Sequence, residues 1–301
     1  MNDVRVGFVG VDQYLDLPRE RDTWLLKPLL PISGACLLYG APKTGKSYLA
    51  IQLGLALSGQ APDWLGFPVV HKGKVLYLQL DTPRTVWALR FEDMIKKGGL
   101  KYDTNTLLLA DRECIEYYPF DIIQPKHMQY LFALVRKHDP TAVIIDTLRE
   151  SHSGDSDSDT SMRNVISNLV GAVHPAALIV VSHSRKTIAD QDKDIMDDHR
   201  GSSFVPGRMD AILRLTKTRL YYAGRSIEAG DIKLERLDNG LWAPAVDGTG
   251  PAIIKVMADN SLTTMRAKAR VLGTLIAKSE EASMSILRRH TSALETAHKT
   301  A

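Results

Sequence analysis

Short runs of hydrophobic residues alternate with longer amphipathic stretches along the first two thirds of the chain. The runs are rich in Val, Ile and Leu, end in turn-forming or charged residues, and cover 35–39, 74–80, 106–110, 142–145 and 178–181. Short runs that are apolar throughout are typical of parallel strands covered on both faces. Amphipathic stretches that predict helices follow most of them, at 46–58, 85–97, 126–137 and 161–173. The alternation predicts an α/β fold with a mostly parallel central sheet.

The pattern changes near residue 210. Four short stretches predict strands at 211–216, 219–223, 232–236 and 241–244, and Asp238-Asn239-Gly240 between the last two is typical of a hairpin turn. From residue 263 the chain is helical in pattern, with a break near Ser279. We therefore expect one α/β domain over 1–250, with a lead-in at 1–33 and a β-hairpin extension at 210–250, followed by a basic helical tail at 251–301.

Composition excludes several classes of protein. Hydrophobic residues make up 44% of the chain and charged residues 24%, so the chain is neither disordered nor fibrous. No apolar run approaches the roughly 18 residues that cross a bilayer, and charges near the N-terminus argue against a secretory signal. We expect a cytoplasmic protein with no membrane partner. Cys36 and Cys114 lack the spacing of metal ligands, and a net charge of +3 neither requires nor excludes a nucleic acid.

A phosphate-binding motif follows the first apolar run. Residues 40–47 read Gly-Ala-Pro-Lys-Thr-Gly-Lys-Ser and satisfy the P-loop pattern G-x-x-x-x-G-K-S/T in full, between a predicted strand and a predicted helix. The two glycines let backbone N–H groups wrap phosphates, the second lysine neutralises phosphate oxygens, and the serine hydroxyl can ligate Mg²⁺. We predict a nucleoside triphosphate site formed by Gly40, Ala41, Pro42, Lys43, Thr44, Gly45, Lys46, Ser47 and Tyr48.

A second metal anchor ends the apolar run at 142–145. Asp146 follows this run directly, which is the arrangement of a Walker B strand, and we expect its carboxylate to hold Mg²⁺ together with Ser47. The alternative is a strand-end Asp that caps a loop. The P-loop upstream favours the metal role.

The residue that activates water has to come from elsewhere in the sheet. In one large class of P-loop motors a Glu follows the Walker B Asp directly, but here Thr147 follows Asp146. Asp81 ends the run at 74–80, and the carboxyl ends of neighbouring parallel strands meet in one crevice. We predict that Asp81 orients the attacking water, a role compatible with its starting the turn before the next helix.

A third strand end carries a candidate sensor. His183 follows the run at 178–181 within Ser-His-Ser-Arg-Lys, and a polar residue there can detect the γ-phosphate and pass its presence to the following loop. A lone His at a strand end is more often only a hydrogen-bonded polar group. The ordered series of strand ends favours the sensor role here.

Taken in order, these motifs resemble the RecA-like ATPases, and within them the RepA-type hexameric replicative DNA helicases. The resemblance covers about 24–244 and rests on Trp24-Leu25 and Pro31, GAPKTGKS, YLQLDTP with Arg90 in the next helix, IIDTLRESH, VVSHSRK, RGSS at 200–203 and the later YYAGRS. RGSS together with this P-loop and HSRK is specific, whereas a P-loop alone is not. Asp81 departs from the family, which has Glu there. We also expect a stand-alone motor, because a primase-like extension is absent from the sequence.

The resemblance implies an assembly and its ligands. ATP and Mg²⁺ lie between subunits of a homo-oligomer, a hexameric ring, and a basic residue of the neighbouring subunit reaches the γ-phosphate. By its position on the strand after RGSS, Arg225 is the first candidate for this residue, with Arg219 and Lys217 as alternatives. Such an arginine finger raises the rate by about 10³–10⁵. The other interpretation is that all three are exposed strand residues.

The resemblance also implies single-stranded DNA in the channel of the ring. The segments that correspond to the DNA-binding loops are 151–160 and 184–200, where Arg185, Lys186 and Arg200 are the candidates for phosphate contacts. Residues 187–198 contain five Asp against one Lys, which weakens the assignment. Aromatic residues of the kind that stack bases are absent from these segments.

These features are interpreted as a RecA-like P-loop core in an ATP-dependent, single-stranded-DNA-dependent motor, a ring-forming replicative helicase. One alternative is a strand-annealing recombinase, which forms filaments. Another is a nucleotide-switched DNA-binding protein with weak ATPase, consistent with Asp81 and the acidic loop. The basic tail is compatible with part of a helix-turn-helix that binds DNA or a partner, or with a helix pair packed at a subunit interface.

Overall fold

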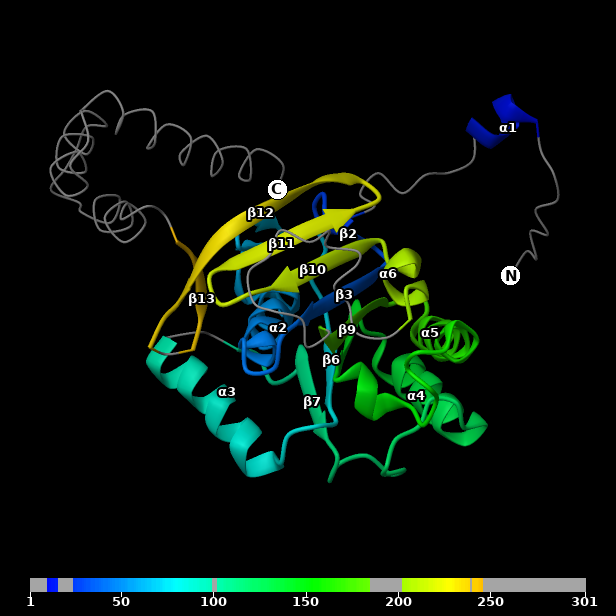
Figure 1. Ribbon diagram of the computed structural model, residues 1–301, viewed down its shortest axis with the longest axis horizontal. Helices are drawn as coiled ribbons and strands as arrows, with labels where there is room; N and C mark the ends of the chain where they lie inside the picture. The colour runs from blue at the N-terminus through cyan, green and yellow to red at the C-terminus, as the bar shows by residue number, and fades with distance from the viewer. Residues whose placement is uncertain (1–9, 16–23, 99–101, 185–201, 239, 246–301) are drawn as a thin grey trace, which may run out of the picture.

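A nine-stranded sheet organises the molecule (Figure 1). The computed structural model describes residues 10–15, 24–98, 102–184, 202–238 and 240–245. In spatial order the strands are β13 (Trp242–Pro244), β12 (Ile227–Arg236), β11 (Arg219–Gly224), β10 (Ala211–Leu215), β3 (Ala35–Gly40), β9 (Ala177–His183), β8 (Ala142–Asp146), β6 (Val75–Gln79) and β7 (Leu107–Asp111).

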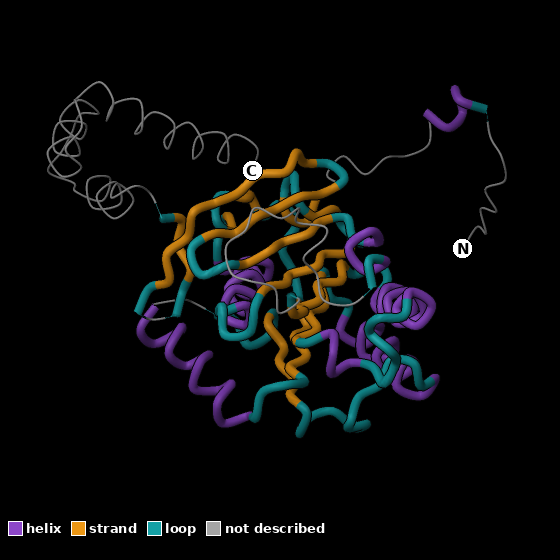
Figure 2. The backbone as a smooth tube through the Cα atoms, viewed as in Figure 1, coloured by secondary structure: helices purple, strands orange, loops and turns teal. Residues whose placement is uncertain are grey.

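Two kinds of strand pairing divide this sheet. From β10 to β7 every neighbouring pair is parallel, whereas β10 to β13 form an antiparallel series of hairpins. The tube in Figure 2 shows the strands in the middle and the helices on either side of the parallel part. The predicted RecA-like α/β fold, with a mostly parallel sheet and a β-hairpin extension, is confirmed.

Helices cover both faces of the parallel strands. On one face lie α2 (Lys46–Leu55) and α3 (Arg84–Gly98), and on the other lie α4 (Pro125–His138) and α5 (Asp159–Val173) (Figure 1). Alternate strand residues enter the two cores: Leu38 and Ile144 pack on the α2 side, Leu37 and Val143 on the α5 side. All four are fully buried, which explains why these strands are apolar at every position.

The remaining elements are short. They are α1 (Val11–Leu15), β1 (Trp24–Leu26), β2 (Leu30–Pro31), a π-helical turn (Ala56–Gln60), β4 (Asp63–Trp64), β5 (Phe67–Pro68), a 3₁₀ turn (Leu148–Ser151) and α6 (Phe204–Arg208). The predicted helix 46–58 is therefore too long, because the α-helix ends at Leu55 and the chain widens into the π-helical turn, where Gly59 has a φ of +99°. A left-handed residue of this kind ends regular helical hydrogen bonding.

Other element boundaries agree with the sequence pattern to within a few residues. The largest difference is β12, which begins at Ile227 rather than at 232, since its first half alternates too little to be recognised as a strand. Residues 251–301 lie outside the described ranges, so the helical tail and the domain boundary at 250 stay predictions. None of the helices within the described ranges is long and apolar enough to cross a bilayer.

Candidate active site

The carboxyl ends of four neighbouring strands bring the predicted residues together. In the β-sheet register Gly40 of β3 lies opposite His183 of β9, and Asp146 of β8 lies opposite Gln79 of β6. Ligands of open α/β sheets bind at this edge, where the loops leave the strands. The sheet thus places the start of the P-loop, the Walker B Asp and the candidate sensor at one edge.

The P-loop adopts the backbone conformation that its glycines permit. Gly45 has a φ of +92° immediately before α2, and Lys43 has a φ of +64°. Gly40 is required by a close approach, because a Cβ there would lie 2.2 Å from the backbone oxygen of Leu215 in β10. Gly45 provides no side chain to cap α2, so the first N–H groups of the helix face the loop, as in anion-binding helix termini.

Lys46 occupies the centre of the site. Its Nζ donates hydrogen bonds to the backbone oxygens of Gly40 at 3.0 Å and Ala41 at 2.9 Å, and lies 3.3 Å from Nδ1 of His183. When Nδ1 accepts this hydrogen bond, the imidazole is neutral with its proton on Nε2. The lysine therefore connects the P-loop directly to the end of β9.

Burial makes Lys46 easier to deprotonate than an ordinary lysine. The side chain is 6% exposed, and desolvation lowers its pKa to about 8, although the charges of Asp146 and Asp81 act in the opposite direction. The influence of both carboxylates on this pKa places them within electrostatic reach of the lysine. An ammonium group held in this way is prepared to bind an anion.

Asp146 is the most deeply buried charged group of the site. It is 1% exposed, its Oδ2 accepts a hydrogen bond from the Tyr77 hydroxyl at 2.8 Å, and its Oδ1 has no hydrogen-bond partner among the described residues. Burial raises the pKa of Asp146, whereas the hydroxyls of Tyr77 and Ser47 and the charge of Lys46 oppose that rise. An unpartnered carboxylate oxygen near a serine hydroxyl matches the oxygen ligands that Mg²⁺ takes in nucleotide sites.

Asp81 lies at the rim rather than in the interior. Its side chain is exposed, and its backbone N–H donates to Oε1 of Gln79 at 2.7 Å, as does that of Thr82 at 3.0 Å. Gln79 is fully buried, and its Nε2 has no partner in the described part of the chain. The buried amide thus fixes the main chain of the turn that presents the Asp81 carboxylate.

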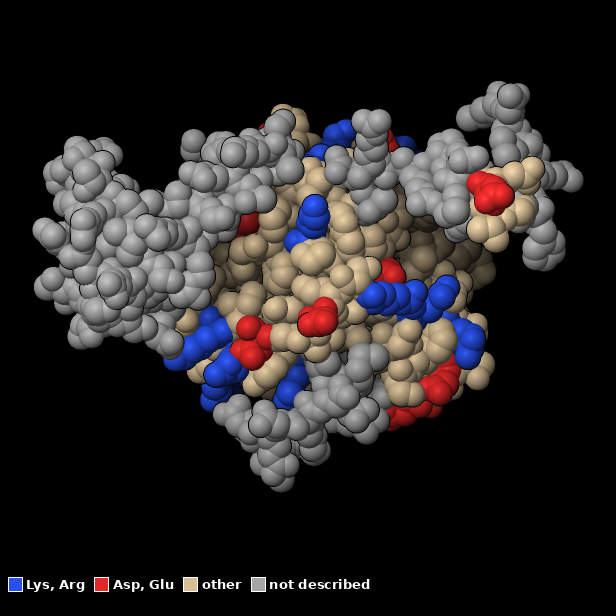
Figure 3. Space-filling view, turned by 90° about the horizontal axis from the view of Figure 1, so that it is seen from above, with Lys and Arg blue, Asp and Glu red and all other residues tan. Residues whose placement is uncertain are grey.

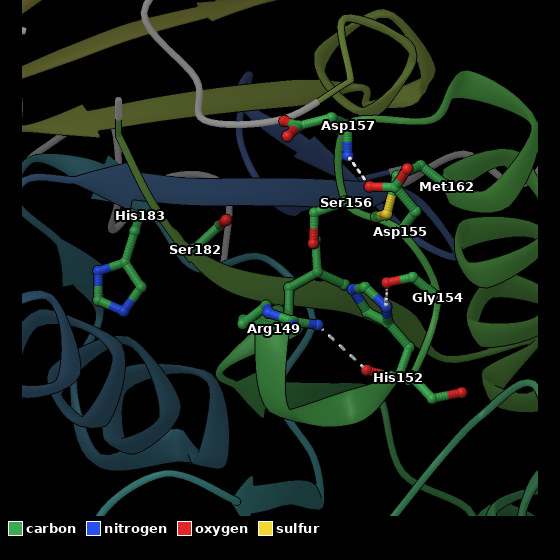
Figure 4. Close-up of a pocket in the computed structure, with 11 residues that line it drawn as sticks. Arg149, His152, Gly154, Asp155, Ser156, Asp157, Met162, Ser182 and His183 are labelled. Carbon is green, nitrogen blue, oxygen red and sulfur yellow. Dashed lines mark hydrogen bonds between the residues drawn. The ribbon is translucent and has the colours of Figure 1, made fainter. Parts of the chain in front are cut away.

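A cavity of about 390 Å³ adjoins His183. Figure 4 shows Ser182 and His183 at the end of β9 on one side, and Arg149 and His152 on the other. His152 is 5% exposed and lies within hydrogen-bond distance of the Gly154 backbone oxygen, with Nδ1 at 3.1 Å. Burial and the Arg149 charge lower the pKa of His152. The segment after β8 therefore has a defined shape beside the candidate sensor.

The candidates for the arginine finger lie at different ends of the strands. Arg225 follows β11 at the opposite ends of the strands, where it pairs with Asp210 at 3.6 Å, so it takes no part in the site of its own chain. Arg219 and Lys217 lie on the P-loop side, since Leu215 is in register with both Gly40 and Leu220. The predicted DNA contacts Arg185, Lys186 and Arg200 lie outside the described residues.

Sequence pattern did not identify three residues of the site. Tyr77 and Gln79 alternate with leucines in β6, and a polar residue at alternate positions of a buried strand end was a signal for them. Trp242 gave no such signal: its Nε1 donates a hydrogen bond at 3.3 Å to the backbone oxygen of Gly45, which lies 197 residues earlier in the chain. Non-local contacts of this kind follow from the fold rather than from local pattern.

Known proteins share both the sequence family and the fold. A family model described as an AAA domain, AAA_25, matches residues 3–189. The curated proteins contain no match. Among solved structures, one titled ATPase Domain of G40P superposes with a TM-score of 0.52 at 13% identity, covering 71% of this chain and 85% of that one. At this identity the likeness concerns the fold.

The family match agrees with the geometry of the site. It spans β3, the P-loop, α2, β8 and β9, which hold the motif, the Walker B Asp and His183. Since the matched segment is more than half of the chain, the protein is a P-loop ATPase that belongs to the AAA domain family AAA_25.

Proposed function

We propose that the protein is an ATP-hydrolysing motor that depends on single-stranded DNA, a cytoplasmic, ring-forming replicative helicase of the RepA-type hexameric group. The observation that carries the proposal is the position of Lys46, whose Nζ contacts both the P-loop carbonyls and Nδ1 of His183. A bound phosphate that draws the Lys46 ammonium toward itself would break the contact between Lys46 and His183. Nucleotide state is thereby coupled to the segment after β9, which corresponds to a DNA-binding loop.

Different residues at the P-loop edge of the sheet have different roles in ATP hydrolysis. Lys46 and the N–H groups at the start of α2 bind the phosphates. Ser47 and Asp146 would hold Mg²⁺, and the unpartnered Oδ1 of Asp146 supports this role. The bound ion neutralises charge that develops on the phosphate oxygens. Asp81 orients the attacking water, and the hydrogen bonds from its turn to Gln79 hold it in place.

A ring explains why Arg225 lies far from its own P-loop. An arginine finger acts in trans, so it has to project from the side of one subunit toward the nucleotide of the next. Arg225 is 58% exposed and lies at the opposite strand ends, which suits contact with a neighbour. Arg219 and Lys217, on the P-loop side of their own chain, are the alternatives.

The DNA interface is the part of the proposal with the least electrostatic support. Figure 3 views the molecule from above, and within its described surface Lys and Arg side chains form separate groups with Asp and Glu between them. Arg149, which lines the cavity beside His183, provides one cation just before segment 151–160. Arg185, Lys186 and Arg200 are proposed to supply the remaining phosphate contacts.

A nucleotide-switched DNA-binding protein with weak ATPase is a second candidate function, and Asp81 favours it. An Asp is one methylene shorter than the Glu of the resembling helicases, and the hydrogen bonds to Gln79 prevent its main chain from moving inward to compensate. In this case nucleotide binding is retained while turnover is slow.

Steady-state ATP hydrolysis with and without single-stranded DNA tests the proposal. We expect strong stimulation by DNA that is lost in Lys46→Ala and in Asp81→Asn. Closed rings in electron micrographs with DNA and ATP would support the helicase, and filaments would support a recombinase. Nucleotide binding without DNA-stimulated hydrolysis would refute the motor and support the switch, and Asp81→Glu should then raise turnover.

A further inference from the structure

A second cavity, of about 250 Å³, lies beside the residue that follows the P-loop. It is lined by Tyr48 in the first turn of α2, Asp93 of α3, and Arg236 and Asp238 of the β12–β13 hairpin. It shares none of its lining with the cavity at His183. Tyr48 directly follows Ser47, and consecutive Cα atoms are about 3.8 Å apart, so this cavity borders the phosphate site.

Hydrogen bonds hold the hairpin in place against α2. Gln52 of α2 donates from Nε2 to the Trp242 backbone oxygen at 2.9 Å and accepts the Trp242 backbone N–H at 3.0 Å. The Trp242 indole donates to the Gly45 oxygen, and a Cβ on Gly240 would lie 2.5 Å from the Tyr48 ring. The cavity wall is thus fixed by contacts among the protein's own residues and is formed before any ligand binds.

Tyr48 and Arg236 form a flat surface at this cavity. The Arg236 guanidinium lies over the Tyr48 ring, 4.0 Å from its centroid, and the Arg90 guanidinium lies 5.8 Å from the same centroid. Arg236 is exposed, so its guanidinium is accessible to a ligand as well as to Tyr48. Planar guanidinium groups stack on aromatic rings and on nucleobases alike.

The charges at the cavity suit a neutral ring better than a phosphate. Asp93 and Asp238 balance the charges of Arg90 and Arg236, and carboxylates repel phosphate while they accept hydrogen bonds from amino groups. Drug-sized ligands fill about 300–1,000 Å³, and a nucleobase is a fraction of that size. A volume of about 250 Å³ therefore holds one base.

We infer that this cavity binds the nucleobase of the nucleoside triphosphate, with Arg236 as the stacking residue that determines affinity for the base. The inference rests on the proposed function, because it requires the triphosphate to lie in the P-loop. It assigns the antiparallel extension a direct part in nucleotide binding.

Binding of ATP and of inorganic triphosphate, both with Mg²⁺, separates the base from the phosphates. Isothermal titration of wild type and Arg236→Ala should give a Kd for ATP at least about fivefold higher in the variant, the lower end of the loss of one base-stacking contact. The Kd for inorganic triphosphate should stay within about twofold, and Arg236→Lys should fall between. Arg136→Ala is the matched control, since Arg136 also lies over a ring, Phe132, at 5.6 Å on distant α4.

Each other result counts against the inference. Equal ATP affinity in wild type and Arg236→Ala, or an equal loss for both ligands, would show that the base does not contact Arg236 while leaving the phosphate site intact. The same loss in Arg136→Ala would also overturn it. A wild-type protein that binds neither ligand would overturn the proposed function together with the base site.

Discussion

The parallel core and the antiparallel extension bury their residues differently, although they belong to one sheet. Every residue of β6 and β8 is buried, whereas β12 contains ten residues of which Leu234 alone is buried. Helices cover the core strands on both faces (Figure 1). Buried residues of the extension, such as Leu220, Leu234 and Trp242, belong to the core cluster on the α2 side.

Because of this difference, we expect the core to provide most of the stability and the extension to provide exposed residues that can contact a ligand. Core strands are packed on two sides, so the residues at their ends, such as Asp146 and His183, are held rigidly. The extension is held by the pairing of β10 with β3 and by its contacts with α2, and its exposed face carries charged residues such as Arg236. Substitutions placed in each region can therefore tell the two contributions apart.

The largest effect is expected from a matched pair of Ile→Ala variants in the two regions. Ile144 of β8 is fully buried, and Ile144→Ala should lower the free energy of unfolding by about 2–5 kcal/mol through lost transfer energy and a cavity. Ile232 of β12 is half-buried, and Ile232→Ala should cost less than about 1.5 kcal/mol. Urea unfolding followed by circular dichroism measures both, and equal losses would remove the distinction between core and extension.

The contact between Trp242 of the extension and Gly45 of the P-loop can be disrupted by a substitution at Gly45. Gly45→Ala places a Cβ 3.0 Å from the Trp242 ring at a φ of +92°, so it should both destabilise the fold and weaken ATP binding more than tenfold. Gly66 has a φ of +88°, and a Cβ added there would meet no atom within 4 Å, so Gly66→Ala should cost only about 1–2 kcal/mol of backbone strain. ATP affinity should be unchanged in Gly66→Ala. Equal ATP affinity in both variants would contradict the role of the contact.

The affinity for ATP should depend on pH through Lys46. The pKa of Lys46 in the free protein is about 8, so its proton is lost as the pH rises through 8, whereas bound phosphates favour the ammonium form. Affinity should therefore fall above pH 8, by up to about tenfold per pH unit. Titrations between about pH 7 and 9.5 measure this, and Lys46→Arg should show no such slope because a guanidinium stays charged. A flat wild-type profile would rule out the lowered pKa.

The smallest effect is expected from an exposed ion pair of the extension. Arg219 and Asp231 pair across β11 and β12 with side chains that are 44% and 37% exposed. Exposed pairs are worth about 0–1 kcal/mol and weaken with salt. A double-mutant cycle of Arg219→Ala and Asp231→Ala, measured by thermal unfolding, should give a coupling in this range. A larger coupling would mean that the extension depends on electrostatics rather than on packing against α2.

Local pattern was sufficient for the fold and for the position of the P-loop motif between a strand and a helix. Apolar runs predicted all of the parallel strands, because the sequence of a strand covered on both faces is a nearly continuous run of hydrophobic residues. The P-loop and Asp146 were predictable because they are contiguous with those strands. Their arrangement at one edge followed from the rule that ligands bind at the carboxyl ends of parallel strands.

Contacts between distant segments were not predictable. The hydrogen bond from Trp242 to Gly45 and the position of Arg236 over Tyr48 depend on where the hairpin folds back, which no local periodicity encodes. The alternation in β6 was a signal for Gln79, but its hydrogen bonds to the Asp81 turn depend on how the chain folds after the strand. The site therefore divides into a part encoded by contiguous motifs and a part created by chain topology.

The pairing of β10 with β3 has a mechanical consequence. These strands are parallel and in register over five residue pairs, from Ala211 opposite Cys36 to Leu215 opposite Gly40. A pull on the extension along the strand direction loads all of these pairs in shear at once, whereas a sideways pull would open them one after another. Since Gly40 begins the P-loop, axial tension on the extension would reach the P-loop through all five of these residue pairs.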